Sequence, residues 1–181
     1  MASLVTGSVA MTAEYADGWL PAMFVPEKAS DVWGDALRRG LSRRHATLGP
    51  LQISAGGLLA LGEDSDVAAV RQRARASTAL YVGGMGAKAK NFYKDVQSRY
   101  GYEREADEIQ QLYRAGKKDE AAALVPDEYL ALSNLCGPVS YVAERIAAFR
   151  EAGVTDLQVT PVPLGDQRAV DLIEQMKALA A

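Results

Sequence analysis

The chain has 181 residues, of which 49% are hydrophobic and 24% charged, and its formal net charge is −3. This is the profile of a globular protein long enough to bury a core, and the acidic balance argues against a broad nucleic-acid surface, which is usually basic. A single cysteine and a single histidine exclude an internal disulfide and a zinc site of the usual kind. No apolar run is long enough to span a membrane, and no signal peptide precedes Glu14. We therefore expect a cytoplasmic protein that binds neither nucleic acid nor membranes and holds no metal.

Helix and strand patterns alternate in the first third of the chain. Residues 8–16 favour a helix, and residues 18–25 favour a short buried strand. Apolar residues at helical spacing predict a helix over residues 27–40. Residues 51–61 (LQISAGGLLAL) are the strongest strand candidate, with Gly56-Gly57 as its bend or its point of close approach.

A long helical stretch follows over residues 66–132. Turn-forming residues near Gly101, Gly116 and Pro126 are expected to interrupt it. We expect the part from about residue 84 to residue 132 to form a helical excursion away from the strands.

The last third returns to alternation. Residues 137–153 predict a helix with proline in its first turn and glycine at its end, residues 155–162 a strand, and residues 166–180 a closing helix. Residues 3–7 are a candidate stub of a further strand. Strands that alternate with helices predict an α/β fold of parallel βα units. The whole chain, residues 1–181, is expected to form a single domain holding at most half of an eight-stranded barrel.

The glycine-rich stretch GGMGAKAKNFYKD, residues 83–95, resembles a phosphate-binding loop only superficially. No glycine in it is followed by the Lys-Ser/Thr pair of a P-loop, and Ala89 stands where a dinucleotide fingerprint needs its third glycine. The better interpretation is a joint between two helices, over residues 66–82 and 89–100, with Gly83-Gly84 as the stop.

Few isolated residues point to catalysis. Cys136 lies in an apolar run where buried packing is expected, and His45 lies in a polar connector where exposure is expected. Lys28 fits an exposed helix start better than a Schiff-base lysine. Glu63 and Asp64 follow a predicted strand, where they either cap the next helix or do chemistry.

Four segments resemble the luciferase-like monooxygenase family, and most closely its deazaflavin-dependent oxidoreductases, which use coenzyme F-420. They are residues 12–37 (TAEYADGWLPAMFVPEKASDVWGDAL), 79–102 (ALYVGGMGAKAKNFYKDVQSRYGY), 116–130 (GKKDEAAALVPDEYL) and 137–162 (GPVSYVAERIAAFREAGVTDLQVTPV). The resemblance runs over nearly the whole chain, but it covers only the C-terminal half of such an enzyme.

The resemblance implies the C-terminal half of a TIM (β/α)8 barrel, with the helical excursion after the second clear strand. It also implies an oxidoreductase that transfers a hydride between a deazaflavin, or alternatively FMN, and a small organic substrate at the carboxyl ends of the strands. The substrate pocket is then expected near the strand ends, at Leu20, Pro21, Phe24, Thr160 and Pro161.

The cofactor is expected at a helix N-terminus and along the strand over residues 51–61. The residues implied are Thr6, Gly7, Ser8, Ala55, Gly56 and Gly57. Free main-chain N–H groups at a helix N-terminus attract a phosphate. The family usually has a Gly-Pro pair where this chain has Val5 and Thr6. The half of the barrel that usually supplies the catalytic acid is not in this sequence, so no catalytic residue is assigned.

Two classes of function remain open from the sequence. In the first, the chain is an oxidoreductase component; in the second, it is a non-catalytic half-barrel, truncated or structural. A half-barrel leaves raw sheet edges, so we expect a homodimer or a partner chain that completes the barrel. Phe92 and Tyr93 either face the site or a partner, or form the core of a small helical cap.

Overall fold

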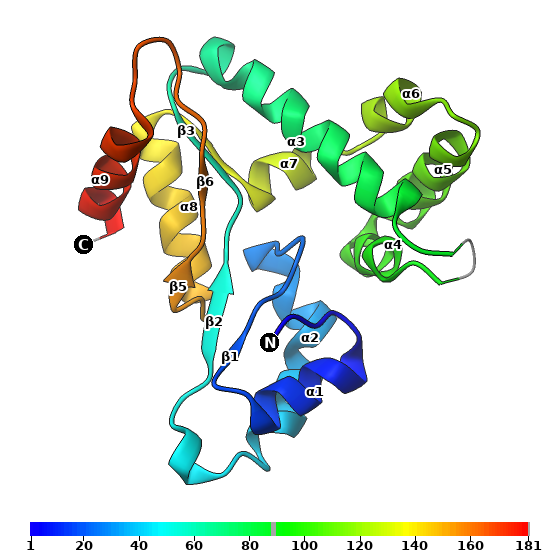
Figure 1. The fold of residues 1–181 in the computed structure, drawn as a ribbon, viewed down its shortest axis with the longest axis vertical. Helices are drawn as coiled ribbons and strands as arrows, with labels where there is room; N and C mark the ends of the chain where they lie inside the picture. Colours follow the sequence, from blue (N-terminus) through cyan, green and yellow to red (C-terminus); the bar gives the residue numbers. More distant parts are fainter. Residues whose placement is uncertain (88–89, 181) are drawn as a thin grey trace.

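The computed structural model describes residues 1–87 and 90–180. In this part of the chain, short strands run through the middle of the molecule, and all their pairings are parallel (Figure 1). The strands are β1 (Gly18–Trp19), β2 (Gln52–Ala55), β3 (Leu58–Leu61), β4 (Leu135–Gly137), β5 (Asp156–Leu157) and β6 (Thr160–Pro161). They form two three-stranded sheets, in the orders β1-β2-β5 and β4-β3-β6. Because β3 continues β2 and β6 continues β5, two kinked strands run through both sheets.

The predicted parallel arrangement of the three main strands is confirmed. Ser54 lies opposite Asp156, and Leu58 lies opposite Thr160. The predicted stub at residues 3–7 is displaced, because the parallel bridge at this edge joins Ala2 to Leu20.

The predicted strand over residues 18–25 is much shorter in the structure. It ends at Trp19, because Pro21 has no N–H to donate to a ladder and Met23 has a φ of 58°, far from extended geometry. The chain then turns away from the sheet.

Strand β4 is a finding that the sequence did not predict. It has three residues, too few to show an alternating pattern. It pairs with β3 on the edge away from β6. Strand β4 and the next long strand, β5–β6, are therefore not neighbours, whereas consecutive strands of a closed barrel are.

The bend at Gly56-Gly57 divides the predicted strand 51–61 into β2 and β3. A Cβ on Gly56 would lie 2.0 Å from the main-chain oxygen of Gln158, and one on Gly57 would lie 2.4 Å from that of Ser133. Close backbone approach therefore requires glycine at both positions.

The helices predicted in the first and last thirds are present, with small shifts at their ends, and the predicted 66–82 helix is present at the start of the excursion. The full set is α1 (Thr6–Tyr15), α2 (Pro26–Leu41), α3 (Asp64–Gly84), α4 (Phe92–Gln97), α5 (Glu103–Arg114), α6 (Lys118–Ala123), α7 (Asp127–Ser133), α8 (Val139–Glu151) and α9 (Ala169–Ala180). A 3-10 turn, Ala46–Leu48, and a π-helical turn, Ser98–Tyr102, complete the list. No helix within residues 1–87 and 90–180 is both long and apolar enough to cross a membrane.

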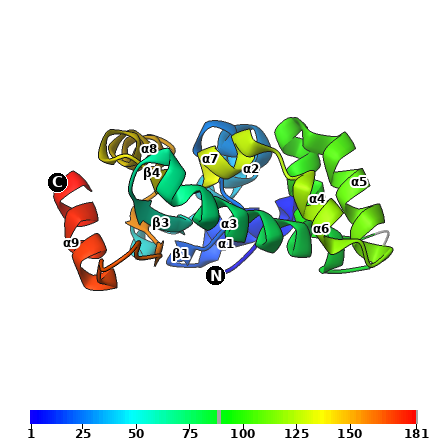
Figure 2. The same ribbon diagram turned by 90° about the horizontal axis from the view of Figure 1, so that it is seen from above.

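The helical excursion is interrupted where the sequence predicted. Gly101 has a φ of 92° and Gly116 a φ of 83°, values that favour glycine. Pro126 is the N-cap of α7. The group α4–α6 lies at one end of the molecule and α9 at the opposite end (Figures 1 and 2).

The joint after α3 has a different cause from the one expected. Helix α3 runs through Gly83 and ends at Gly84. A Cβ on Gly83 would lie 2.3 Å from Cβ of Tyr113, so this glycine lets α5 approach α3 closely. Asn91 then caps α4, accepting from the amide of Tyr93 at 3.0 Å. The predicted restart at residue 89 lies outside the described residues.

An aromatic cluster fixes the loop after β1 against the helices. Trp33 of α2 lies 5.2 Å from Trp19, 6.0 Å from Phe24 and 6.1 Å from Tyr100 between ring centroids. Phe149 of α8 contacts Phe24 from the other side, at 5.9 Å. Offset and edge-on aromatic pairs of this kind contribute beyond the area they bury. The cluster holds the segment that carries Phe24 rigidly at the end of β1.

Candidate functional site

A cavity of about 520 Å³ lies at the bend of the central strand. Its walls come from the loop after β1, the Gly56-Gly57 bend, one face of α3, the end of α7 and Thr160 of β6. The carboxyl ends of parallel strands are the usual place for a ligand site in α/β proteins. Among the residues that the structure describes, the lining contains hydroxyl, amide and guanidinium groups and no carboxylate. We call it the bend cavity.

Helix α3 presents polar residues at helical spacing to the bend cavity. Arg73, Ser77 and Tyr81 follow one another at intervals of four and line it, which places them on one face of the helix. Ala74 and Thr78, one position along, are buried. The sequence predicts the helix over residues 66–82 but does not indicate that this face carries a site.

The end of α7 is fixed by Asn134, which also lines the bend cavity. Its Oδ1 accepts from the amide of Leu58 at 3.0 Å, and its Nδ2 donates to the carbonyl of Leu130 at 2.9 Å. Asn134 therefore joins α7 to the central strand and has little capacity left for a ligand.

Tyr129 is buried and lines the bend cavity. Burial raises its pKa to about 12, and hydrogen bonds from the side chains of Ser133 and Thr78 oppose that rise only in part. The phenol is therefore protonated at neutral pH and is suited to donate a hydrogen bond, not to act as a base.

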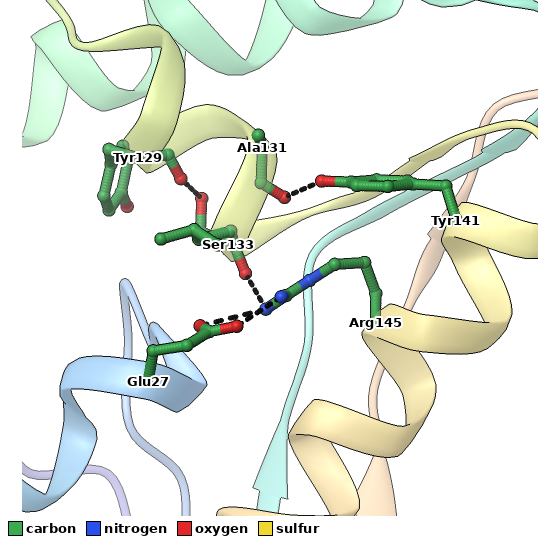
Figure 3. Close-up of polar contacts among 7 residues, drawn as sticks. Glu27, Tyr129, Ala131, Ser133, Tyr141 and Arg145 are labelled. Atoms are coloured by element: carbon green, nitrogen blue, oxygen red, sulfur yellow. Dashed lines mark hydrogen bonds and ion pairs between the residues drawn. The ribbon is translucent and has the colours of Figure 1, made fainter.

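An ion pair lies behind this wall (Figure 3). Arg145 of α8 makes a bidentate contact with Glu27 of α2 and donates to the carbonyl of Leu132 at 2.7 Å. Tyr141 of the same helix donates to the carbonyl of Ala131 at 2.8 Å. These bonds fix the strand-proximal end of α7 and hence the position of the residues that line the cavity.

A second hollow, of about 310 Å³, lies beside the N-terminal segment. It is lined by residues 2–5, Ser8, Leu20 and the aromatic pair Phe92 and Tyr93, and it shares Ala22 with the bend cavity. Phe92 is exposed, with 40% of its surface accessible, which argues against one of the two alternatives left open by the sequence, that it is core of a helical cap.

The first turn of α1 borders this hollow. The first main-chain bond of the helix runs from Val9 to Val5, so the amides of Thr6, Gly7 and Ser8 have no main-chain acceptor among the described residues. The Ser8 hydroxyl donates to the carbonyl of Val5 at 2.8 Å. A Cβ on Gly7 would meet no atom within 4 Å, so the turn is open to a ligand.

The structure gathers most of the residues expected at the site, in two groups. Phe24, Gly56, Gly57 and Thr160 line the bend cavity. Leu20 and Ser8 line the second hollow, with Thr6 and Gly7 in the adjoining turn. Ala55, Pro21 and Pro161 line neither. Ala55 is buried in β2 and Pro161 is paired in β6.

The isolated candidates are placed away from both hollows. Cys136 is buried, and His45 is exposed, as expected. Lys28 is not the exposed helix start that was expected, because its ammonium donates to the carbonyl of Tyr100 and the hydroxyl of Tyr102, both at 3.0 Å. Asp64 pairs with Arg71 at 2.9 Å. No group of three or more His, Cys, Asp or Glu side chains that could hold a metal exists among the residues that the structure describes.

Comparison with known proteins agrees with this architecture. A family model described as luciferase-like monooxygenase matches residues 1–156. A putative coenzyme F-420-dependent oxidoreductase of Mycobacterium tuberculosis is 37% identical over 155 residues, which is 84% of this chain and 44% of the relative.

Two solved structures show the same fold. The coenzyme F-420-dependent tetrahydromethanopterin reductase of Methanopyrus kandleri superposes with a TM-score of 0.65 at 21% identity, over 99% of this chain and 47% of that one. An F-420-dependent secondary alcohol dehydrogenase, in complex with an F-420–acetone adduct, superposes with a TM-score of 0.55 at 13% identity, over 99% of this chain and 48% of that one. The chain spans about half the length of the proteins it matches.

Proposed function

Because the chain belongs to the luciferase-like monooxygenase family, we propose that it is part of a coenzyme F-420-dependent oxidoreductase that acts on a small organic substrate. The observation that carries the proposal is the bend cavity, about 520 Å³ in volume, at the bend of the central strand where β2 ends. A cavity of this size, which combines apolar side chains with hydroxyl, amide and guanidinium groups, can hold a cofactor or a small molecule. When bound, the deazaflavin would supply the hydride chemistry.

The residues present fit such a cofactor. The first turn of α1 offers the free amides of Thr6, Gly7 and Ser8, and the open space at Gly7 leaves room for a phosphate. The bend at Gly56-Gly57 brings bare backbone to the cavity surface, where a flat ring can approach closely. Ala55 supports the bend from beneath, as a buried strand residue.

The remaining lining residues would position the substrate and exclude water. Phe24 is held by stacking on Trp33 and forms an apolar wall. Thr160 offers a hydroxyl from the neighbouring strand, and Leu20 extends the apolar surface toward the second hollow. Pro21 stiffens the loop after β1, and Pro161 lies in β6 next to Thr160.

The isolated chain would hold the cofactor without completing the chemistry. Its strands form three-stranded sheets with open edges, whereas hydride transfer requires the donor within about 3–3.5 Å of its acceptor in a closed, dry site. We propose that the barrel is completed by self-association, most simply as a two-fold dimer, or by a partner chain. The second candidate function, a non-catalytic half-barrel, rests on the same open edges.

Titration of the purified chain with coenzyme F-420 and, separately, FMN tests the proposal. We expect saturable binding of F-420, followed by its fluorescence, and weaker binding of FMN. Substitution of Gly7 by aspartate should weaken F-420 binding about tenfold, because it puts a like charge at the anion-binding turn. Absence of F-420 binding to a folded chain would refute the assignment.

Turnover then separates the two candidate functions. Mixed with reduced F-420 and a panel of enones and ketones, the isolated chain as a monomer should show weak or undetectable turnover, because its half-site stays open. Light scattering on the same sample gives the oligomeric state. Steady turnover by a dimer would exclude the non-catalytic half-barrel, and turnover by a stable monomer would refute the need for completion.

A further inference from the structure

Arg71, Arg73 and Arg75 occupy every second position along part of α3, and their surroundings differ. Arg71 pairs with Asp64 and donates to the carbonyl of Cys136, both at 2.9 Å. Arg75 contacts Asp127 and the carbonyl of Val125. Both therefore tie α3 to neighbouring elements. Arg73, between them, has no ion-pair or hydrogen-bond partner within residues 1–87 and 90–180, and it is exposed at the bend cavity.

The environment of Arg73 leaves its charge uncompensated. The positions three and four residues away on either side are Ala69, Val70, Ala76 and Ser77, so the helix supplies no carboxylate within reach. No acidic side chain lines the bend cavity, and Arg73 is the one charged residue in its described lining. A positive group facing a hollow without counter-charge attracts anions.

We propose that Arg73, with the hydroxyl of Ser77, binds an oxyanion of the molecule that occupies the bend cavity, a carboxylate or a phosphate. The guanidinium fork matches either group in a bidentate manner. Ser77 follows one helical turn later on the same face and is exposed, and Tyr81 extends the stripe by a further turn. The inference rests on the proposed function. The oxyanion belongs either to the substrate or to the cofactor's tail.

Matched ligands and matched variants test the site. The substrate arm uses para-fluorocinnamate and its methyl ester, followed by the fluorine NMR signal of the ligand. The cofactor arm uses coenzyme F-420 and the same deazaflavin without its phosphate-bearing tail, followed by fluorescence. The variants are Arg73→Ala, Ser77→Ala and the control Arg39→Ala, which removes the same charge from an exposed position on α2 outside the cavity.

We expect the acid to bind more tightly than the ester. Arg73→Ala should weaken binding of the acid about tenfold and leave binding of the ester unchanged. Ser77→Ala should have a smaller effect of the same kind, and Arg39→Ala none. Added salt should weaken binding of the acid to the unmodified protein but not to Arg73→Ala. If Arg73→Ala instead weakens F-420 and spares the tail-less deazaflavin, the oxyanion is that of the cofactor.

The proposal is overturned if Arg73→Ala leaves the acid and F-420 unchanged, or weakens acid and ester alike. Thermal unfolding serves as the folding control, and Arg73→Ala should unfold at the same temperature as the unmodified chain, because it loses no ion pair or hydrogen bond among the described residues. A failure of the proposed function is distinguishable, because the chain would then bind no F-420 while the substrate arm still reports on Arg73.

Discussion

The guanidinium of Arg145 on α8 donates to both carboxylate oxygens of Glu27 on α2, at 3.1 Å to Oε2, and also to the carbonyl of Leu132 (Figure 3). The arginine side chain is 7% exposed and the glutamate 40%. One buried cation thus joins the end of α7 to α8, and both of them to α2, which lies more than 100 residues earlier in the chain. The end of α7, which lines the bend cavity, is held in place by this contact.

Loss of Arg145 should destabilise the fold. Arg145→Ala removes three charge-assisted hydrogen bonds, and we expect the free energy of unfolding to fall by about 2–3 kcal/mol. Because the Glu27 side chain is half exposed, the loss of stability should be smaller than for a fully buried ion pair. Urea unfolding measures the change. As a control, Arg104→Ala removes an exposed pair with Glu108 at 3.7 Å and should cost less than about 0.5 kcal/mol. Equal losses in the two variants would contradict the assigned role.

The ion pair between Glu27 and Arg145 predicts that the stability of the fold depends on pH. Burial opposes ionisation of Glu27, but hydrogen bonds from Arg145 outweigh it, and the pKa of the carboxyl is lowered from its usual 4.5. A carboxyl with a lowered pKa in the folded state stabilises it fully above the usual pKa, and the contribution is lost as the pH falls through the lowered value. The stability difference between the unmodified chain and Glu27→Gln should therefore be constant from pH 7 to pH 5 and shrink below about pH 4.5. A difference that grows on acidification would contradict the sign.

The sequence predicts the element types well because they depend on local periodicity. Helix α8 combines a proline N-cap, an apolar stripe at Val142, Ile146 and Phe149, and Gly153 at a φ of 88°. Each of these signals acts within a few residues. Strand β4 carries no such signal, because its three residues are defined by pairing with β3, more than 70 residues earlier in the chain.

Some of the residues expected at a site line the bend cavity, and their signal in the sequence is also local. Gly56 and Gly57 stand out in a strand pattern, and the structure places both at the bend cavity. The opposite wall, formed by Arg73 and Ser77, depends on how α3 folds back over the strand ends, which is a tertiary relationship. An arginine with unpaired surroundings at helical spacing from Ser77 and Tyr81 was the available signal.

Cys136 should be unreactive in the folded protein. It is buried beside β3, and burial raises the pKa of its thiol to about 11, a rise that the nearby Arg71 opposes only in part. The reactive species is the thiolate, so native protein at pH 8 should react slowly with a disulfide reagent such as DTNB. In guanidinium the same protein should react at once and with one thiol per chain. Rapid stoichiometric labelling of the native form would show that β4 opens easily.

Glycine substitutions at the Gly56-Gly57 bend should lower the stability of the fold, whatever their effect on ligand binding. A Cβ on Gly57 would lie 2.4 Å from the oxygen of Ser133 and 3.2 Å from Cα of Asn134, and these main-chain atoms cannot yield without moving the end of α7 away from the strand. We expect Gly57→Ala to lower the free energy of unfolding by at least about 2–3 kcal/mol. Gly7→Ala is the matched control, because its Cβ meets no atom within 4 Å and alanine in a helix gains about 0.5–1 kcal/mol over glycine.

Denaturant unfolding of both variants beside the unmodified chain provides the measurement. The expected order of stability is Gly7→Ala, then the unmodified chain, then Gly57→Ala. Because Gly57→Ala moves the cavity wall, a loss of F-420 binding in that variant reports on the fold and not on a ligand contact. If Gly57→Ala were as stable as the unmodified chain, the close approach of β3 to the end of α7 would be wrong, and with it the geometry of the bend cavity.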